Sequence, residues 1–188
     1  MAKVSKKQWV EQALALLAAS GHQGVTLDAL LNELGVSHGS FYHHFKNRRA
    51  LTDAMLDEWE QSMSLDIFQR SSTISSLSQR IDSLIDSGEN LFSLQLPLEI
   101  AIRSWAQSDE GVNAVVRRVD LLRRQHCQTL AALVVSDAQR AKVLGDLIHA
   151  VFVGSQQSLP AYSAKETRDV YTELQRLLIS QANRETQP

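Results

Sequence analysis

The chain has 188 residues, of which 44% are hydrophobic and 21% are charged. These proportions are typical of globular proteins and exclude disordered and collagen-like chains. Only 8 glycines and 3 prolines are present, which argues against a turn-rich sandwich or barrel. No apolar run reaches the roughly 18 residues of a membrane-spanning helix, and the first residues lack the apolar core of a signal peptide. The single cysteine, Cys127, excludes an intrachain disulfide, so we expect a soluble cytoplasmic protein.

The net charge of −2 is unevenly distributed along the chain. Residues 1–50 carry six basic and three acidic side chains, a net of 6 − 3 = +3. Residues 51–188 carry 13 basic and 18 acidic side chains, a net of 13 − 18 = −5. A basic segment joined to an acidic body suggests that the basic segment binds an anion such as nucleic acid. Taken alone this signal is weak, because basic side chains often only solvate a surface.

Apolar residues recur with a spacing near 3.6 throughout the chain, which predicts helices and no strands. In the N-terminal third, Gly21 is expected to end the first helix and Gly35 the second. The third helix is expected to end near Lys46. The residues expected to cap the starts of the first four helices are Ser5, Thr26, Ser37 and Asn47.

Serines and threonines become frequent between Ser62 and Ser78, and we place a domain junction there. Beyond it the apolar periodicity again predicts helices, with Asp137 as an N-cap and Pro160 as a helix end. The segments expected to be helical in this part are 77–92, 97–105, 112–133, 138–159 and 164–178.

Residues 26–45 combine a short helix, a turn with a glycine and a second short helix, which is the geometry of a helix-turn-helix. The leucines of the first helix, with Phe41 and Phe45 of the second, would form its core. Gly39 costs roughly 1 kcal/mol of helix propensity relative to alanine, and a position facing the DNA groove would explain that cost. The face opposite the core offers small side chains and hydrogen-bond donors. It consists of Ser37, His38, Gly39, Ser40, Tyr42, His43, His44 and Lys46.

The segment TLDALLNELGVSHGSFYHHFKNRRALTDAML resembles the DNA-binding region of the TetR (tetracycline-repressor) family of bacterial transcription regulators. The matching features are Thr26 at the start of the second helix, the turn LGVS at 34–37 and the aromatic block FYHHF at 41–45. The match continues through residues 46–51. Phe41 is a mild departure, because such proteins often have leucine there. Residues 65–188 share only the all-helical layout of the family.

The resemblance implies an all-α fold with a helix-turn-helix head at 1–47, a connecting helix at 48–64 and a helical effector-binding and dimerisation domain at 65–188. It further implies a homodimeric repressor that binds double-stranded operator DNA and is released by a small molecule. Contacts to the DNA backbone are implied for Thr26, Tyr42 and Lys46, with His44 near the backbone and Arg48 as a further candidate. Base contacts are implied for Ser37, His38, Gly39 and Ser40.

The segment 138–159 is apolar on one face, and a second face carries Gly145, His149, Phe152 and Gln156. A helix covered on two sides suits a protein interface on one side and a domain interior on the other. We therefore expect the segments 137–159 and 164–182 to form a four-helix interface between two copies. Candidate contacts there are Ile148, Val151, Leu174 and Leu177.

A ligand site is expected in the body, although an aromatic stripe is more often ordinary core. His126 falls on the apolar stripe of its helix, where a polar group needs a partner. Few charges fall on the inner faces, so we expect a largely apolar or aromatic ligand held by one or two hydrogen bonds. Its candidate contacts are Phe92, Trp105, His126, Phe152 and Gln156.

Other kinds of site are less well supported. The spacing of His38, His43 and His44 does not suit a metal ion, and no carboxylate or cysteine joins them, so no metal or cofactor is expected. Arg123 and Arg124 precede Cys127 by one turn, which would lower the pKa of a redox-sensing thiol, but an inert cysteine is the favoured interpretation.

No phosphate loop or nucleophile motif is present, so we do not expect an enzyme. Two alternatives stay open. One is a DNA-binding regulator without a small-molecule effector. The other is an all-helical enzyme or adaptor whose basic head is incidental.

Overall fold

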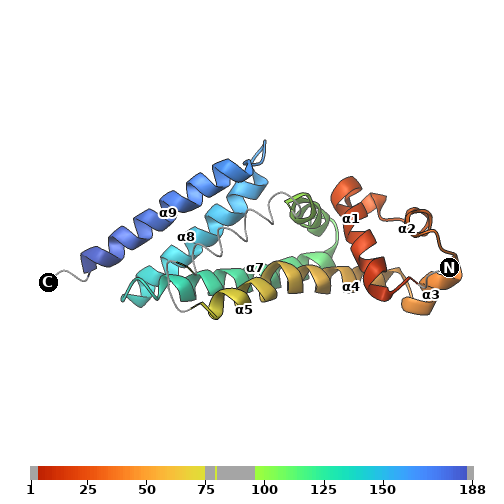
Figure 1. Cartoon of the computed structure of the whole chain (residues 1–188), viewed down its shortest axis with the longest axis horizontal. Helices are drawn as coiled ribbons and strands as arrows, with labels where there is room; N and C mark the ends of the chain where they lie inside the picture. The colour runs from red at the N-terminus through yellow and green to blue at the C-terminus, as the bar shows by residue number, and fades with distance from the viewer. Residues whose placement is uncertain (1–3, 75–78, 80–95, 186–188) are drawn as a thin grey trace. The chain divides into compact units, whose positions relative to one another are not determined.

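The computed structural model describes residues 4–74, 79 and 96–185. These residues form helices and their connections, without a strand, which confirms the predicted all-α class. Apart from Gln79, the predicted helix at 77–92 lies outside the described residues, as does the candidate ligand residue Phe92. The helices are α1 (Lys6–Gly24), α2 (Leu27–Leu34), α3 (His38–His44), α4 (Arg48–Glu60), the π-helical turn η1 (Gln61–Leu65), α5 (Asp66–Ser72), a helical segment at 96–106, α7 (Glu110–Ala131), α8 (Ala138–Gln157) and α9 (Ala164–Glu185) (Figure 1).

The chain divides into two compact units. The N-terminal unit contains Met1–Ser62 and Pro97–Val116, and the C-terminal unit contains Met63–Leu96 and Arg117–Pro188. Residues 97–116 belong to the N-terminal unit, in which Glu99 contacts Trp59 and Trp105 contacts His22.

Local signals set the ends of the first helices. In α1, the Ser5 hydroxyl accepts from Gln8 N (3.3 Å) and the Gln8 side chain accepts from Ser5 N (2.8 Å), which is a capping box. Gly21 interrupts the helical backbone of α1 with a φ of 67° and a ψ of −179°, at the position where the sequence predicts the helix to end. Gly35 ends α2 in the left-handed region (φ 63°), a conformation that favours glycine.

An aromatic cluster forms the core of the N-terminal unit. Trp9 of α1 packs edge-on against Phe41 and Phe45, with ring centroids 5.5 and 6.5 Å apart, and all three side chains are buried. α1 also packs against α2 and α4. Because Phe41 lies in the middle of α3 and Phe45 directly follows its last residue, this cluster fixes the position of α3. The other fully buried large side chains of the cluster region are Leu17, Leu30, Met55, Leu56 and Trp59.

In the C-terminal unit, α7 and α8 approach closely at one point. A Cβ atom on Gly145 of α8 would overlap the backbone of Gln128 of α7, so glycine is required there. The Gln128 amide donates to Asp146 Oδ1 (2.8 Å) beside this crossing. Asp137 caps α8 by accepting from Arg140 N (2.7 Å), as the sequence predicts. α9 turns back along α8 (Figure 1).

Candidate nucleic-acid interface

The turn between α2 and α3 presents the start of α3 to solvent. Thr26 Oγ1 caps α2 by accepting from Ala29 N (3.1 Å), and its hydroxyl hydrogen remains available as a donor. Ser37 occupies the N-cap position of α3 with an extended backbone, but its side chain makes no capping hydrogen bond. Ser40 N instead donates to Ser37 O (2.9 Å). The predicted Thr26 cap is therefore confirmed, whereas Ser37 occupies the predicted N-cap position without a capping hydrogen bond from its side chain. Thr26 and Ser37 are both exposed.

The outer face of α3 is exposed as the helical periodicity predicts. Tyr42 is 62% exposed although its ring packs edge-on against the buried Phe41, with centroids 5.3 Å apart. His38 and His43 are also exposed. A Cβ atom on Gly39 would meet nothing closer than Ser37 Oγ at 3.8 Å, an ordinary contact. Nothing in the described part of the fold therefore requires glycine at position 39.

His44 has a role within the fold that the sequence did not reveal. Its Nε2 lies 2.8 Å from Val4 O, so this nitrogen donates to the carbonyl, and the ring is half-buried. His44 thereby links Val4, which precedes the N-cap residue of α1, to the end of α3. Lys46 follows α3 in an exposed position, next to Asn47, whose side chain caps α4.

Two arginines of the predicted basic head are used in contacts within the N-terminal unit. Arg48 donates through one guanidinium nitrogen to Val25 O (2.9 Å), which joins the start of α4 to the end of α1. Arg49 pairs with Asp53 (2.8 Å) and lies 3.9 Å from Asp109. These contacts make both arginines part of the scaffold that holds α2 and α3.

A carboxylate also lies beside the predicted recognition face. Asp28 Oδ1, in the first turn of α2, is 3.8 Å from His38 Nε2 at the start of α3. Both side chains are mostly exposed, at 85% and 65%. Periodicity gives no signal for this pair, because it depends on how the turn brings the two helices together.

The candidate ligand residues divide between the two units. Trp105 belongs to the N-terminal unit, where its ring stacks on His22 with centroids 5.8 Å apart and an interplanar angle of 6°. His126, Phe152 and Gln156 belong to the C-terminal unit. His126 stacks on Phe68 (4.0 Å) and lies 3.4 Å from Ser71 Oγ, which supplies the polar partner expected for it. The described contacts of Trp105 therefore lie in the N-terminal unit, whereas His126, Phe152 and Gln156 lie in the C-terminal unit.

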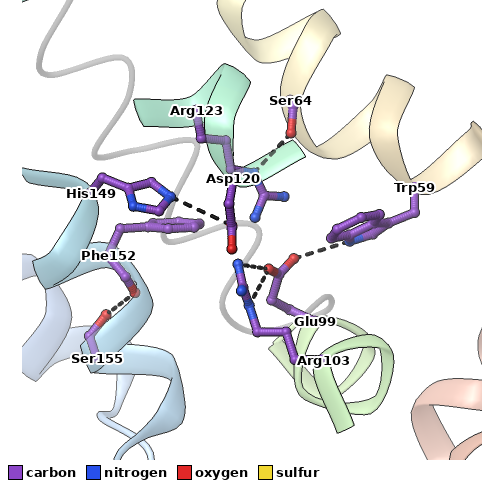
Figure 2. Close-up of polar contacts among 9 residues, drawn as sticks. All are labelled: Trp59, Ser64, Glu99, Arg103, Asp120, Arg123, His149, Phe152 and Ser155. Carbon is purple, nitrogen blue, oxygen red and sulfur yellow. Dashed lines mark hydrogen bonds and ion pairs between the residues drawn. The ribbon is translucent and has the colours of Figure 1, made fainter. Parts of the chain in front are cut away.

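Polar side chains lie near Phe152, and among them the burial of Arg123 was not predicted from the sequence (Figure 2). Arg123 of α7 is almost fully buried; its guanidinium lies 5.3 Å from the Phe152 ring and its Nε donates to Ser64 Oγ (2.9 Å). The buried His149 has its Nε2 3.5 Å from Asp120 Oδ1, an ion-pair distance without hydrogen-bond geometry. Gln156 Oε1 is buried and has no hydrogen-bond partner among the described residues. The Phe152 region is therefore more polar than the apolar ligand site expected from sequence.

The candidate interface residues of α8 and α9 differ in exposure. Ile148, Val151 and Leu174 are half-buried, whereas Leu177 is 51% exposed. At Gly154, nothing lies within 4 Å of the position a Cβ atom would take. The most exposed large apolar side chains on α8 are two that sequence reasoning did not select, Val143 (55%) and Leu147 (48%).

Cys127 is half-buried, and desolvation raises the pKa of its thiol to about 12 despite the lowering effect of the Arg123 guanidinium. A redox-sensing thiol needs a lowered pKa, because the thiolate is the reactive form, so the raised pKa of Cys127 is the opposite of what that role requires. Among the described residues, no three His, Cys, Asp or Glu side chains are grouped as a metal site. No described helix combines the length and the apolar character that crossing a membrane requires.

Comparison with known proteins identifies relatives of this chain. Residues 10–55 match the family of bacterial regulatory proteins, tetR family. The TetC protein of transposon Tn10 from Escherichia coli is 30% identical over 133 residues, covering 62% of this chain and 66% of its own length. The class D tetracycline repressor protein from Escherichia coli is 38% identical over 58 residues, covering 31% of this chain and 27% of its own length. The chain thus spans less than two thirds of the length of each relative.

A solved structure has the same fold over nearly the whole chain. It is a transcriptional regulator from Rhodococcus sp. Rha1, with a TM-score of 0.74, 13% identity, and coverage of 94% of this chain and 97% of that one. The matched residues 10–55 contain α2, the turn and α3, together with Phe41 and Phe45 of the aromatic cluster. Residues 10–55 belong to the tetR family of bacterial regulatory proteins.

Proposed function

We propose that the chain is a homodimeric DNA-binding transcription regulator of the cytoplasm, a repressor that a small ligand releases from a palindromic operator. The observation that carries this proposal is α3, a short helix held by buried aromatic rings on one face and exposed on the other. Its Gly39 has open space where a side chain would be. A helix entering the major groove needs such a face. We propose no catalytic activity and no cofactor.

The exposed groups have the chemistry that each proposed DNA contact needs. Hydroxyl and ammonium groups are suitable donors to phosphate oxygens, which supports Thr26, Tyr42 and Lys46 as backbone contacts. His44 is placed near the backbone in the same proposal, with its Nε2 engaged by Val4 O. Small or hydrogen-bonding side chains at the start of the recognition helix suit base edges. These are Ser37, His38, Gly39 and Ser40.

Selection of bound duplexes from a random DNA pool, followed by affinity measurements across a range of salt concentrations, tests DNA binding directly. Lys46→Ala should weaken binding to all sequences alike and reduce the salt slope by about one. Ser40→Ala should instead change the preferred base at one position, at about 1–3 kcal/mol for a lost good contact. A wild-type protein that enriches no sequence and shows no salt-dependent binding would overturn the proposal.

A homodimer is proposed because one helix-turn-helix contacts only a few base pairs, whereas two on a palindrome give useful specificity. The exposed side chains of Val143 and Leu147 on α8 and Leu177 on α9 support an interface on these helices. Ile148, Val151 and Leu174 would lie at its partly buried margin. Gly154 would allow the helices of two copies to approach closely.

The effector is proposed to bind in the C-terminal unit, in contact with His126, Phe152 and Gln156. The unpartnered Gln156 Oε1 supports a ligand that carries a hydrogen-bond donor next to an apolar or aromatic body. Phe92 is kept as a candidate contact. Trp105 is kept as a spectroscopic reporter, because its contacts lie in the N-terminal unit. Such a ligand can weaken DNA binding only by the factor by which it binds more tightly to the protein state that does not bind DNA.

Screening small aromatic compounds for release of the selected DNA tests the effector. An active compound should lose affinity for a Gln156→Leu variant, while the affinity of that variant for DNA without the compound should be unchanged. The matched control is Gln157→Leu, because Gln157 is the exposed neighbour on the same helix. If no compound changes DNA affinity, the protein is a regulator without a small-molecule effector.

A further inference from the structure

The pair formed by Asp28 and His38 joins the two helices of the helix-turn-helix at their exposed ends. Asp28 comes from the first turn of α2 and His38 is the first residue of α3, and the atoms Oδ1 and Nε2 are 3.8 Å apart. Pairs this exposed contribute little to stability in water. Stabilisation of the free protein therefore does not explain why these two side chains are paired.

The pair lies among the residues proposed to contact bases. Ser37 and Gly39 flank His38, and the open space at Gly39 lets a groove approach this end of α3. Across the turn, Asp28 is the charged group that the structure places against the His38 ring. On α3 itself, the residue one turn further is Tyr42. The imidazole of His38 thus has a carboxylate on one side and the proposed DNA on the other.

We propose that Asp28 is a positioning residue that holds the imidazole of His38 in its protonated form in the complex with DNA. The protonated His38 then donates to a base, and DNA binding takes up a proton. This inference rests on the proposed function. It adds a residue that does not itself contact DNA and a dependence of binding on pH.

The chemistry follows from the two ring nitrogens. A protonated imidazole donates from both, so Nε2–H points to the Asp28 carboxylate and Nδ1–H is available to an acceptor. In the major groove, guanine presents N7 and O6 as acceptors, and every other base except cytosine also offers one. A neutral imidazole whose proton stays on Nε2 toward Asp28 presents only a lone pair at Nδ1. That form repels the same acceptors.

DNA binding shifts this equilibrium toward the protonated ring. Phosphates add negative charge near the imidazole, and removal of water from the groove strengthens its attraction to Asp28. Because binding takes up a proton, affinity should fall as the pH rises, by up to about tenfold per pH unit for each head that takes up one proton.

The test measures DNA affinity of the full-length protein between pH 5.5 and 8.5 at fixed salt, on the duplex selected with the wild-type protein. Proton uptake is measured separately by calorimetry in buffers of different ionisation enthalpy. Asp28→Asn removes the charge at constant shape. Glu33→Gln is the matched control, because it removes one negative charge from the other end of the same helix, where Glu33 is exposed.

We expect the wild-type protein and Glu33→Gln to share a steep pH dependence, and Asp28→Asn to lose most of it together with the proton uptake. A simple change of net charge would instead raise the affinity of both variants equally and leave the slopes unchanged. That result would overturn the proposal while leaving the proposed function intact. Melting temperatures equal to that of the wild-type protein establish that each variant is folded.

A second pair of variants keeps the inference testable if Asp28→Asn does not fold. His38→Gln should bind without a pH dependence and change the preferred base at one position, whereas His43→Gln should retain the wild-type slope. His43 is a suitable control because it is exposed on the same helix and its ring packs on His44, with centroids 5.0 Å apart. A full pH dependence in His38→Gln would overturn the proposal. Absence of DNA binding by the wild-type protein at every pH would overturn the proposed function and this inference together.

Discussion

The indole nitrogen of Trp59 donates a hydrogen bond of 3.0 Å to Glu99 Oε2 inside the N-terminal unit (Figure 2). The other carboxylate oxygen of Glu99 accepts from Arg103 Nε at 2.9 Å. The side chains of Glu99 and Arg103 are only 2% and 11% exposed. A buried charged pair of the segment 96–106 is therefore joined to α4, which explains why residues 97–116 pack with the head.

Breaking this pair should destabilise the N-terminal unit. Glu99→Gln leaves the Arg103 guanidinium buried without its carboxylate, and we expect a loss of about 3–5 kcal/mol in the free energy of unfolding. Trp59→Phe should cost less, because Glu99 keeps Arg103 as a partner. Urea unfolding followed by circular dichroism measures both. The control is Glu173→Gln, which removes the exposed Glu173–Arg176 pair of α9 and should cost less than about 1 kcal/mol.

Gly39→Ala separates folding from DNA binding. Position 39 is helical and open, so alanine should stabilise the fold by about 0.5–1 kcal/mol through helix propensity. The added methyl group would lie between α3 and the proposed groove, so DNA affinity should fall. Gly35→Ala has the opposite expectation for stability, because Gly35 has a φ of 63° that alanine adopts only with strain. A Gly39→Ala protein that binds the selected DNA as tightly as the wild type would contradict the placement of this face in the groove.

The head could be predicted from sequence because its determinants are local. Ser5, Thr26 and Asn47 act as caps where their residue types predict, and Gly21 and Gly35 interrupt or end helices. Apolar spacing also identified the buried face of α3. Each of these signals depends on residues within one or two turns of one another, which is the range over which a sequence pattern carries structural information.

The contacts that depend on distant residues could not be predicted. Trp59 meets Glu99 across 40 positions, and Arg123 meets Ser64 across 59. A periodicity argument assigns charged residues to solvent, so it placed neither Glu99 nor Arg123 in the interior. It also selected Ile148 and Val151 for the interface, although Val143 and Leu147 are the more exposed apolar residues of α8. Exposure depends on which neighbouring helix covers which face, and the sequence of α8 alone does not contain that information.

Leu147→Glu tests the proposed dimer. Leu147 is 48% exposed on α8, so glutamate should be tolerated in a folded monomer but should prevent association across an apolar interface. Sedimentation should show monomers at micromolar concentration, and binding to a palindrome should weaken to that of a single head. Leu133→Glu is the control, because Leu133 is 53% exposed in the connection between α7 and α8. A wild-type protein that sediments as a monomer would rule out the dimer.

The desolvated thiol of the half-buried Cys127 gives the last prediction. Because burial raises its pKa to about 12, the thiolate is nearly absent at pH 8, and iodoacetamide should label the native protein far more slowly than the urea-unfolded protein.

The same pKa shift of Cys127 links the stability of the protein to pH. Below the ordinary value of 9.0 the thiol is neutral in both states and its contribution is complete; between 9.0 and about 12 only the unfolded chain ionises. The stability difference between wild type and Cys127→Ala should therefore fall by about 1.4 kcal/mol per pH unit in that interval. Measuring the difference between these two proteins cancels the titration of other groups, and rapid labelling of the native protein at pH 8 would show instead that Cys127 is accessible and ionised.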